Sequence, residues 1–141
     1  MKPYPWKCAT CRTQAVEPAT IPAYVADLEH DGRKYQVVVE NLDVLQCRHC
    51  GAIVLDDDAS DRLSDSLRAA AGLLSPEQIR RHREGLGLTQ KQLASLLRIS
   101  ESTLSRWETG GQIQQRCMDA FLRVVFESVE ARSILGTALA G

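Results

Sequence analysis

The chain has 141 residues, of which 44% are hydrophobic and 25% charged, and its formal net charge is −1; these values are ordinary for a globular protein. No apolar run approaches the ~18–20 residues that cross a bilayer, and the N-terminal residues contain no apolar stretch of a signal peptide's length. We therefore expect a cytoplasmic protein, in which a disulfide framework for the five cysteines is disfavoured. Residues 1–74 carry 8 basic and 11 acidic residues, whereas residues 75–141 carry 9 and 7, so the two halves differ in sign.

Two Cys-x-x-Cys motifs lie in the N-terminal part, separated by residues 12–46. Each motif places two thiolates on one side of a metal ion, and two motifs complete the four-sulfur tetrahedron of structural zinc. Redox chemistry is the alternative, but a redox motif usually has one such pair beside a β-α-β unit, which the sequence lacks. We predict one structural zinc ion per chain, with the ligands Cys8, Cys11, Cys47 and Cys50.

The residues around the two motifs are expected to support the metal without binding it. Four cysteines complete the site, so His49 is predicted to lie at the surface, outside the ligand set. A zinc ion with four thiolates is formally an anion, which nearby cations would offset. The candidates for this role are Lys7, Arg12 and Arg48.

Residues 1–55 are predicted to form a small β-rich domain. Two extended runs flank Asp31-Gly32, a strong signal for a two-residue hairpin, and short strands flank the second cysteine motif. A segment this small does not bury a self-sufficient core, so the metal would staple it.

Residues 56–74 are predicted to form a connecting helix. Asp56 to Asp58 crowd its start, Arg68 lies near its end, and Leu63 and Leu67 share one face. The acidic start is interpreted as a solvated N-terminal cap, with binding of a basic partner as the alternative.

From Ser75 onward the sequence is typical of an all-α domain, residues 75–141. The pairs Ser75/Gln78 and Thr89/Gln92 are capping boxes. They and the following glycines predict helices at residues 76–86, 90–97 and 101–109, then a longer helix at about 113–129 and one or two turns, or a frayed tail, beyond it. We expect Cys117 to be a small buried residue of the long helix.

Three short helices joined by tight turns predict a helix-turn-helix, whose third helix enters the major groove of DNA. At about 100° per residue, Leu104 and Trp107 face the core. The opposite face is polar, and Arg106 on it is suited to a bidentate contact with guanine. The predicted DNA-binding residues are Thr89, Gln90, Ser100, Glu101, Ser102, Ser105, Arg106 and Thr109. Among them, Thr89, Gln90 and Ser100 lie at helix N-termini, whose free backbone N–H groups are expected to contact phosphate. Gln112, Gln114 and Arg116 are further phosphate candidates.

Two other functions compete with DNA binding as interpretations of this sequence. A three-helix unit with such caps can bind protein instead. A zinc deaminase requires His-x-Glu followed by Pro-Cys-x-x-Cys, but here the only such signal, at His82–Glu84, follows both cysteine motifs and lies within a capped helix. We expect no enzymatic activity.

The stretch "LGLTQKQLASLLRISESTLSRWETG" resembles the phage-repressor (Xre/Cro) type of helix-turn-helix. Preceded by "CATC" and "CRHCG", residues 8 to about 127 are similar to the MqsA family of antitoxins with a YgiT-type zinc finger. The resemblance implies an α+β chain: a β-rich zinc domain followed by an all-α, five-helix domain. It also implies a structural ion pair between Arg83 and Glu108. Ser102 departs from the pattern, because the best-known member has asparagine there, and the tail past Glu127 has no counterpart.

Members of that family dimerise through the C-terminal half, bind a palindrome in their own promoter and block a toxin, commonly an mRNA-cleaving ribonuclease, through the zinc domain. The sequence is therefore expected to encode a bacterial antitoxin and autorepressor. The helix from Ile113 is the candidate dimer seam, although the same residues also suit a closed core. The alternatives are a stand-alone regulator whose zinc domain has a structural or sensing role, and a protein-binding adaptor.

Overall fold

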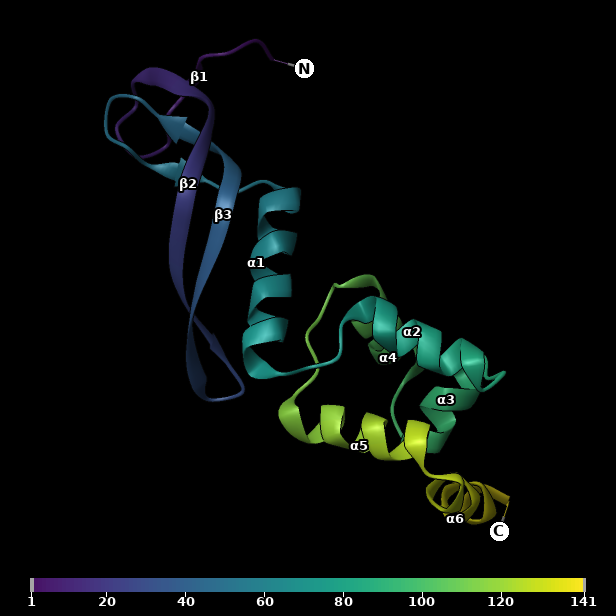
Figure 1. Cartoon of the computed structure of the whole chain (residues 1–141). Coiled ribbons are helices and arrows are strands. Elements are labelled where there is room, and N and C mark those ends of the chain that lie inside the picture. The colour runs from purple at the N-terminus through teal and green to yellow at the C-terminus, as the bar shows by residue number, and fades with distance from the viewer. Residues whose placement is uncertain (1, 141) are drawn as a thin grey trace. The chain divides into compact units, whose positions relative to one another are not determined.

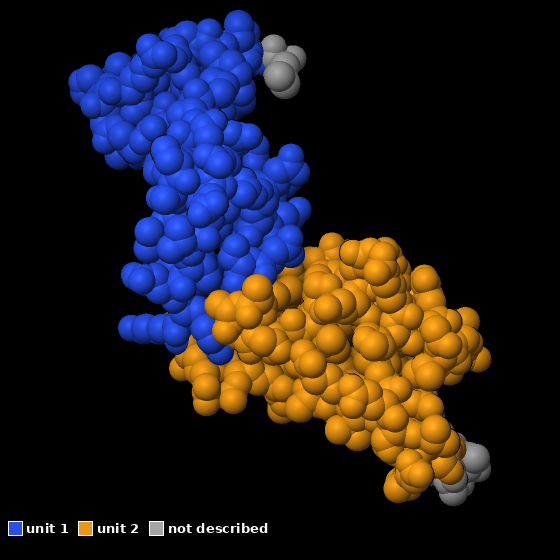
Figure 2. Space-filling model, in the orientation of Figure 1, with its two compact units in different colours: residues 1–28, 34–67 blue, residues 29–33, 68–141 orange. Residues whose placement is uncertain are grey.

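The computed structural model describes residues 2–140, and the side chains of residues 2–136. The chain divides into two compact units, residues 1–28 with 34–67 and residues 29–33 with 68–141 (Figure 2). The first unit contains a four-stranded antiparallel sheet and the second consists mainly of helices, which confirms the predicted α+β class. Within the described part of the chain, no helix has both the length and the apolar character to cross a membrane.

The sheet of the first unit is built on one long hairpin. Strand β2 (Gln14–His30) and strand β3 (Arg33–Cys47) are neighbours, and the short strands β1 (Trp6–Lys7) and β4 (Ile53–Val54) pair with their far ends, giving the order β1-β2-β3-β4. The two turn residues, Asp31 and Gly32, both have positive φ, 52° and 75°. This conformation matches the right-handed twist of the strands and confirms the predicted hairpin.

Helix α1 (Asp57–Ala71) covers one face of this ribbon, as Figure 1 shows. Asp56 caps it, since the Asp56 carboxylate accepts the backbone N–H of Ala59 at 2.8 Å. Ala59 and Leu63 on α1 pack against buried residues of β3: Val37, Val39, Leu42 and Val44. The buried side chains of β3 are at odd positions up to Val39 and at even positions from Leu42 onward. The change occurs at Asn41, which has a φ of 51°.

Arg62 of α1 fixes the ribbon at that irregularity. Its guanidinium donates to the carbonyls of Glu40 at 2.7 Å and of Asn41 at 2.9 Å. Residues around a bulge leave backbone carbonyls without a ladder partner, and a charged donor satisfies them at little cost. The helix is therefore joined to the sheet by both apolar packing and directed hydrogen bonds.

The second unit contains α2 (Pro76–Gly85), α3 (Gln90–Leu97), α4 (Glu101–Thr109), α5 (Arg116–Glu127) and α6 (Val129–Ala140). Both predicted capping boxes are present: Ser75 with Gln78, and Thr89 with Gln92. The core of the unit comprises Leu74, Ile79, Leu93, Ala94, Leu97, Leu104, Trp107, Leu122, Val125 and Phe126. The first three helices thus lie within a residue of their predicted bounds.

The end of the chain differs from the prediction. The expected helix at 113–129 begins at Arg116 and ends at Glu127, because Ser128 is extended (φ −109°, ψ 113°) and α6 follows it. Cys117, predicted to be buried, is exposed. The inward face of α5 is formed by Asp119, Leu122, Val125 and Phe126, and this periodicity turns position 117 outward.

A buried polar network joins the loop before α5 to the loop between α1 and α2. The Asp119 carboxylate accepts the backbone N–H of Leu74 at 2.8 Å and the side-chain amide of Gln114 at 3.1 Å, and that amide also donates to the Leu74 carbonyl at 2.9 Å. Arg123 pairs with the other Asp119 oxygen at 2.9 Å. Gln114 is fully buried in this network, so its predicted role as a phosphate contact is wrong.

The hairpin turn, residues 29–33, belongs to the same unit as this network. The His30 imidazole donates through Nε2 to the Gln114 carbonyl at 2.9 Å, and the backbone N–H of Arg116 donates to the Asp31 carboxylate at 3.0 Å. Asp31 therefore caps α5 from a distant part of the sequence, a role that the local residue Gln115 does not perform with its side chain.

Candidate functional site

The two cysteine motifs come together at the end of the sheet where β1 and β4 lie. The thiol sulfurs of Cys8, Cys11, Cys47 and Cys50 all lie within 4.8 Å of one another, with Cys8 and Cys50 at 3.7 Å and Cys11 and Cys47 at 3.6 Å. Four sulfurs at ~2.3 Å from a tetrahedral zinc ion are about 3.8 Å apart. The four-cysteine cluster is thus compatible with one zinc ion.

Both motifs adopt the same local turn. The backbone N–H of Arg12 donates to the Cys8 carbonyl and that of Gly51 to the Cys47 carbonyl, each at 2.9 Å, and Arg12 and Gly51 both have positive φ. Backbone N–H groups also point at sulfur: that of Thr10 at Cys8 (3.4 Å) and that of Cys50 at Cys47 (3.5 Å). Such donors stabilise thiolates, the form in which cysteine binds metal.

The surroundings of Cys8, Cys11 and Cys50 shift the pKa values of these thiols in different directions. Hydrogen bonds from the side chain and backbone of Thr13 lower the pKa of Cys11 to about 5. The backbone N–H groups of Cys11 and Thr10 lower the pKa of Cys8. The Ala52 backbone N–H lowers the pKa of Cys50, but burial and the neighbouring cysteines outweigh it and raise this pKa to about 11. A metal ion that takes all four sulfurs must therefore displace the proton of Cys50.

The residues predicted to surround the metal are placed differently from one another. His49 is exposed and lies outside the four-cysteine cluster. Its imidazole hydrogen-bonds the Cys11 sulfur, and this contact contributes to the lowered pKa of the Cys11 thiol. Arg48 pairs with Glu17 at 2.7 Å rather than with sulfur. Its side chain is 79% exposed, so this pair adds little stability. Lys7 and Arg12 are also exposed.

The second candidate site is the α3–α4 pair. Arg98 ends α3 in the left-handed conformation (φ 61°), and Ser100 opens α4 by accepting the Thr103 backbone N–H at 3.1 Å. Leu104 and Trp107 are buried, as predicted. The opposite face presents Ser102, Arg106 and Thr109 to solvent, with Ser105 half-buried and Glu101 exposed in the first turn. This polar face has one cation, which suits readout of base edges.

The residues predicted to contact phosphate lie in different surroundings: two cap helices, one is half-buried and two are exposed. The Thr89 and Ser100 hydroxyls accept backbone N–H groups and fix the starts of α3 and α4. Gln90 is half-buried, and its amide reaches the Glu108 carboxylate at 3.3 Å. Gln112 and Arg116 are exposed. No local sequence pattern predicts the contact between Gln90 and Glu108, because the two residues lie on different helices.

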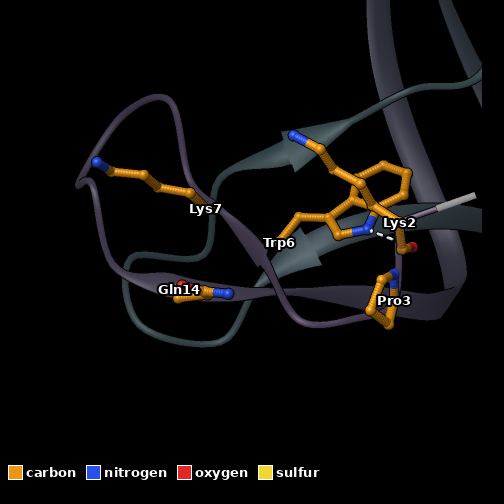
Figure 3. A pocket seen from close by; sticks show the side chains of 5 residues that line it. All are labelled: Lys2, Pro3, Trp6, Lys7 and Gln14. Carbon is orange, nitrogen blue, oxygen red and sulfur yellow. Dashed lines mark hydrogen bonds between the residues drawn. The ribbon is translucent and has the colours of Figure 1, made fainter.

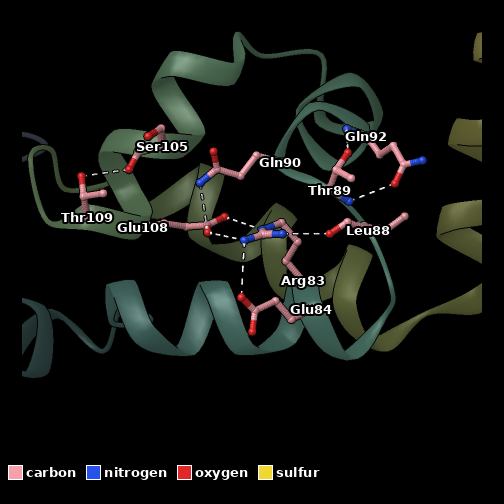
Figure 4. Close-up of polar contacts among 9 residues, drawn as sticks. All are labelled: Arg83, Glu84, Leu88, Thr89, Gln90, Gln92, Ser105, Glu108 and Thr109. Carbon is pink, nitrogen blue, oxygen red and sulfur yellow. Dashed lines mark hydrogen bonds and ion pairs between the residues drawn. The ribbon is translucent and has the colours of Figure 1, made fainter.

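Arg83 and Glu108 are brought together as a bidentate ion pair (Figure 4). Arg83 Nε and Nη2 each lie 2.9 Å from a Glu108 oxygen, and Nη1 donates to the Leu88 carbonyl at 2.9 Å. The Arg83 side chain is 12% exposed and that of Glu108 2%. Hydrogen bonding to Glu108 raises the pKa of Arg83. The pair links α2, the loop before α3, and the end of α4, and thereby orients the polar face.

Comparison with known proteins agrees with this second site. A search of curated proteins finds no significant match to the chain. Residues 79–116 match a helix-turn-helix family model, HTH_3. The matched segment runs from within α2, through α3 and α4, to the first residue of α5. The C-terminal unit therefore carries a helix-turn-helix of the HTH_3 type, which indicates a DNA-binding regulator.

Proposed function

We propose that the chain is the antitoxin of a type II toxin–antitoxin system, which acts in the bacterial cytoplasm and represses its own operon. The observation that carries the DNA-binding part is the helix-turn-helix match together with the polar, exposed face of α4 around Arg106. In this proposal Arg106 contacts guanine, Ser102 and Ser105 contact base edges or backbone, and the N-termini of α3 and α4 contact phosphates. No reaction is catalysed.

The four-cysteine cluster is proposed to hold one structural zinc ion per chain. The sulfur spacing and the N–H groups directed at sulfur support this assignment. Around the cluster the buried set is small, consisting of Cys8, Val16 and Cys47, so packing alone gives this end of the unit little stability. Zinc would supply the missing free energy of folding, and its removal would unfold the sheet end.

The remainder of the first unit is proposed to bind the toxin, in particular a ribonuclease. Proteins that grip RNA present basic surfaces, and the ribbon and α1 are acidic: Asp27, Glu40 and Asp43 on the strands, and Asp56, Asp57, Asp58, Asp61 and Asp65 at the helix. β1 and β4 pair with only one end of the hairpin, which leaves strand edges for augmentation. Exposed Val25 and Val38 add apolar contact area.

A homodimer is proposed because a palindromic operator needs two recognition helices about 34 Å apart. The outward face of α5 offers a seam of small and apolar residues, with Cys117, Ala120 and Val124 exposed, and Val124 is 52% exposed. A second copy of the chain would bury this face. The dimer would also raise affinity for DNA, to which a single weakly charged unit binds modestly.

The test is expression of the full chain with the protein encoded beside it in its genome. The proposal expects a neighbour that is toxic alone, harmless together and retained on the tagged chain. Arg106→Ala should keep that complex and lose binding to the upstream promoter, whereas Cys47→Ser should lose the complex. A neighbour that is neither toxic nor retained contradicts the antitoxin role. Promoter binding that then responds to chelator or oxidant would favour the stand-alone regulator with a sensing zinc domain.

A further inference from the structure

The charges of the first unit are separated between its two ends. Residues 2–16 and 45–52, which form the end with the four-cysteine cluster, contain four basic residues, Lys2, Lys7, Arg12 and Arg48, of which Arg48 is paired with the adjacent Glu17. The rest of the unit carries nine acidic residues and two basic ones. The acidic part matches a basic partner, so the basic cysteine end is a separate feature that the proposed toxin contact does not use.

This basic end contains a pocket of about 760 Å³, shown in Figure 3. Lys2, Pro3, Trp6, Lys7 and Gln14 line it, and most of its lining is apolar. It is an open groove at the surface, and its volume falls within the range of sites for small organic ligands, which combine an apolar wall with a few polar groups. Both lysines are exposed, and Figure 3 shows Lys2 beside the Trp6 indole and the Lys7 ammonium directed away from it.

The aromatic wall is held in place by three contacts. The Trp6 indole N–H donates to the Lys2 carbonyl at 2.9 Å, and the Tyr4 ring stacks on Trp6 with centroids 4.7 Å apart. The Gln14 amide donates to the Pro5 carbonyl at 3.3 Å, which ties the segment before β1 to β2. A fixed aromatic surface loses little conformational entropy when a second ring packs on it.

We propose that this pocket binds a nucleotide, either free or as one unit of a single-stranded nucleic acid, with its base against the exposed side of the stacked Tyr4–Trp6 pair, its phosphate on Lys2, and Lys7 available to a neighbouring phosphate of a strand. Aromatic side chains that accept any base, beside cations that follow the phosphates, are the common elements of single-strand binding. The four-cysteine cluster sits directly behind Trp6, since Trp6 packs on the buried Cys8, Val16 and Cys47 set. The affinity for the ligand would thus depend on the folding of the sheet end that holds the four cysteines.

An acidic peptide is the other anion that lysines attract, and the observations favour it less. A carboxylate needs the charge but not an aromatic wall, whereas a nucleotide uses both parts of the pocket. The site is independent of the duplex contact proposed for α4, because no residue is shared between the two. Failure of one proposal therefore leaves the other measurable on the same protein.

The test is a titration of the full zinc-loaded chain with short oligothymidylate and, separately, with thymidine monophosphate, followed by tryptophan emission. Trp107 is 2% exposed in the core, so quenching by a ligand reports Trp6. The strand should quench emission. Trp6→Leu removes the reporter, so its binding is measured by the anisotropy of a labelled strand, and it should weaken strand binding about 5- to 150-fold. Lys2→Gln and Lys7→Gln, both at exposed positions, should each lower the slope of log affinity against log salt by about 0.7. Lys34→Gln, an exposed lysine of the acidic ribbon, is the matched control and should change neither quantity.

The outcomes separate the ligand sources. Binding of the strand but not the monophosphate identifies a nucleic-acid strand, and equal competition by the monophosphate identifies a free nucleotide. Arg106→Ala must leave both unchanged, because it belongs to the duplex site. Equal quenching and competition by polyglutamate would show a site for acidic protein and overturn the proposal. So would unchanged emission, or lysine variants that bind the strand as tightly as the parent while keeping their zinc.

Discussion

The ion pair between Arg83 and Glu108 allows a sharp test of how the DNA-binding unit is held together. We predict that Arg83→Met destabilises this unit severely, because it leaves the Glu108 carboxylate buried without its cation. That side chain is 2% exposed, and two of its three hydrogen bonds come from Arg83. After the substitution, only the Gln90 amide at 3.3 Å remains.

The size of the effect follows from that burial. Removal of one partner from a buried pair costs about 3–5 kcal/mol, far more than the ~0–1 kcal/mol of an exposed pair. The exposed pair between Arg81 and Glu77, at 2.8 Å on α2, supplies the matched control, since Arg81→Met removes the same charge at 75% exposure. Replacing both buried partners, Arg83→Met with Glu108→Leu, removes the stranded charge. The double variant should therefore recover most of the loss.

The assay is equilibrium unfolding in urea with zinc in excess. Each unit contains one tryptophan, Trp6 in the first and Trp107 in the core of the second. In a Trp6→Phe background, emission reports only the second unit, which avoids mixing two transitions. With a slope of about 2 kcal/mol/M, a loss of about 3–5 kcal/mol lowers the midpoint by about 1.5–2.5 M.

Two results would refute this reasoning. An Arg83→Met variant within about 1 kcal/mol of the parent would mean that Glu108 is solvated or rearranges freely. A double variant that costs the sum of the two single variants would mean that the residues act independently.

Three further predictions address the other parts of the molecule. Cys47→Ser should reduce bound zinc from about one equivalent to well below one and abolish the folded signal of Trp6, as measured by metal analysis and fluorescence. Arg106→Ala should weaken operator binding by about 1–3 kcal/mol and relax specificity at one base without lowering the melting temperature, whereas Arg80→Ala, on the exposed side of α2, should do neither. Arg62→Met should destabilise the first unit by about 1–2 kcal/mol, seen in the Trp6 transition, because the Glu40 and Asn41 carbonyls lose a charged donor; an unchanged transition would show that water replaces it.

Local signals in the sequence predicted the parts of the structure that depend on local physics. Thr89 and Gln92 three residues apart specify a helix start, and Asp31-Gly32 specifies a tight turn whatever surrounds them. The cysteine spacing likewise predicted which four sulfurs would meet.

The errors concern residues whose environment is set by distant partners. Gln114 looked like a surface residue because its partners, the Leu74 backbone and Asp119, are joined to it only by the fold. Cys117 was misplaced because the apolar content of the segment was clear but its helical phase was not, and the phase depends on where α5 begins. The break at Ser128 has no glycine or proline to mark it. Within the candidate site, the residue types were foreseen, but the contact of Gln90 with Glu108 was not.

The capping of α5 by Asp31 has a consequence for how such a chain can change by recombination. The turn that carries Asp31 and His30 lies in the middle of the zinc-binding half of the sequence but belongs structurally to the helical unit. Leu74, the last residue before the all-α domain predicted from the sequence, likewise belongs to the helical core. An exchange of the N-terminal halves between related genes would therefore replace Asp31, the residue that caps α5, although α5 itself is encoded in the other half. Only donors whose hairpin has the same length and an acid at its turn would yield a functional hybrid, which ties the two halves to a shared evolutionary history.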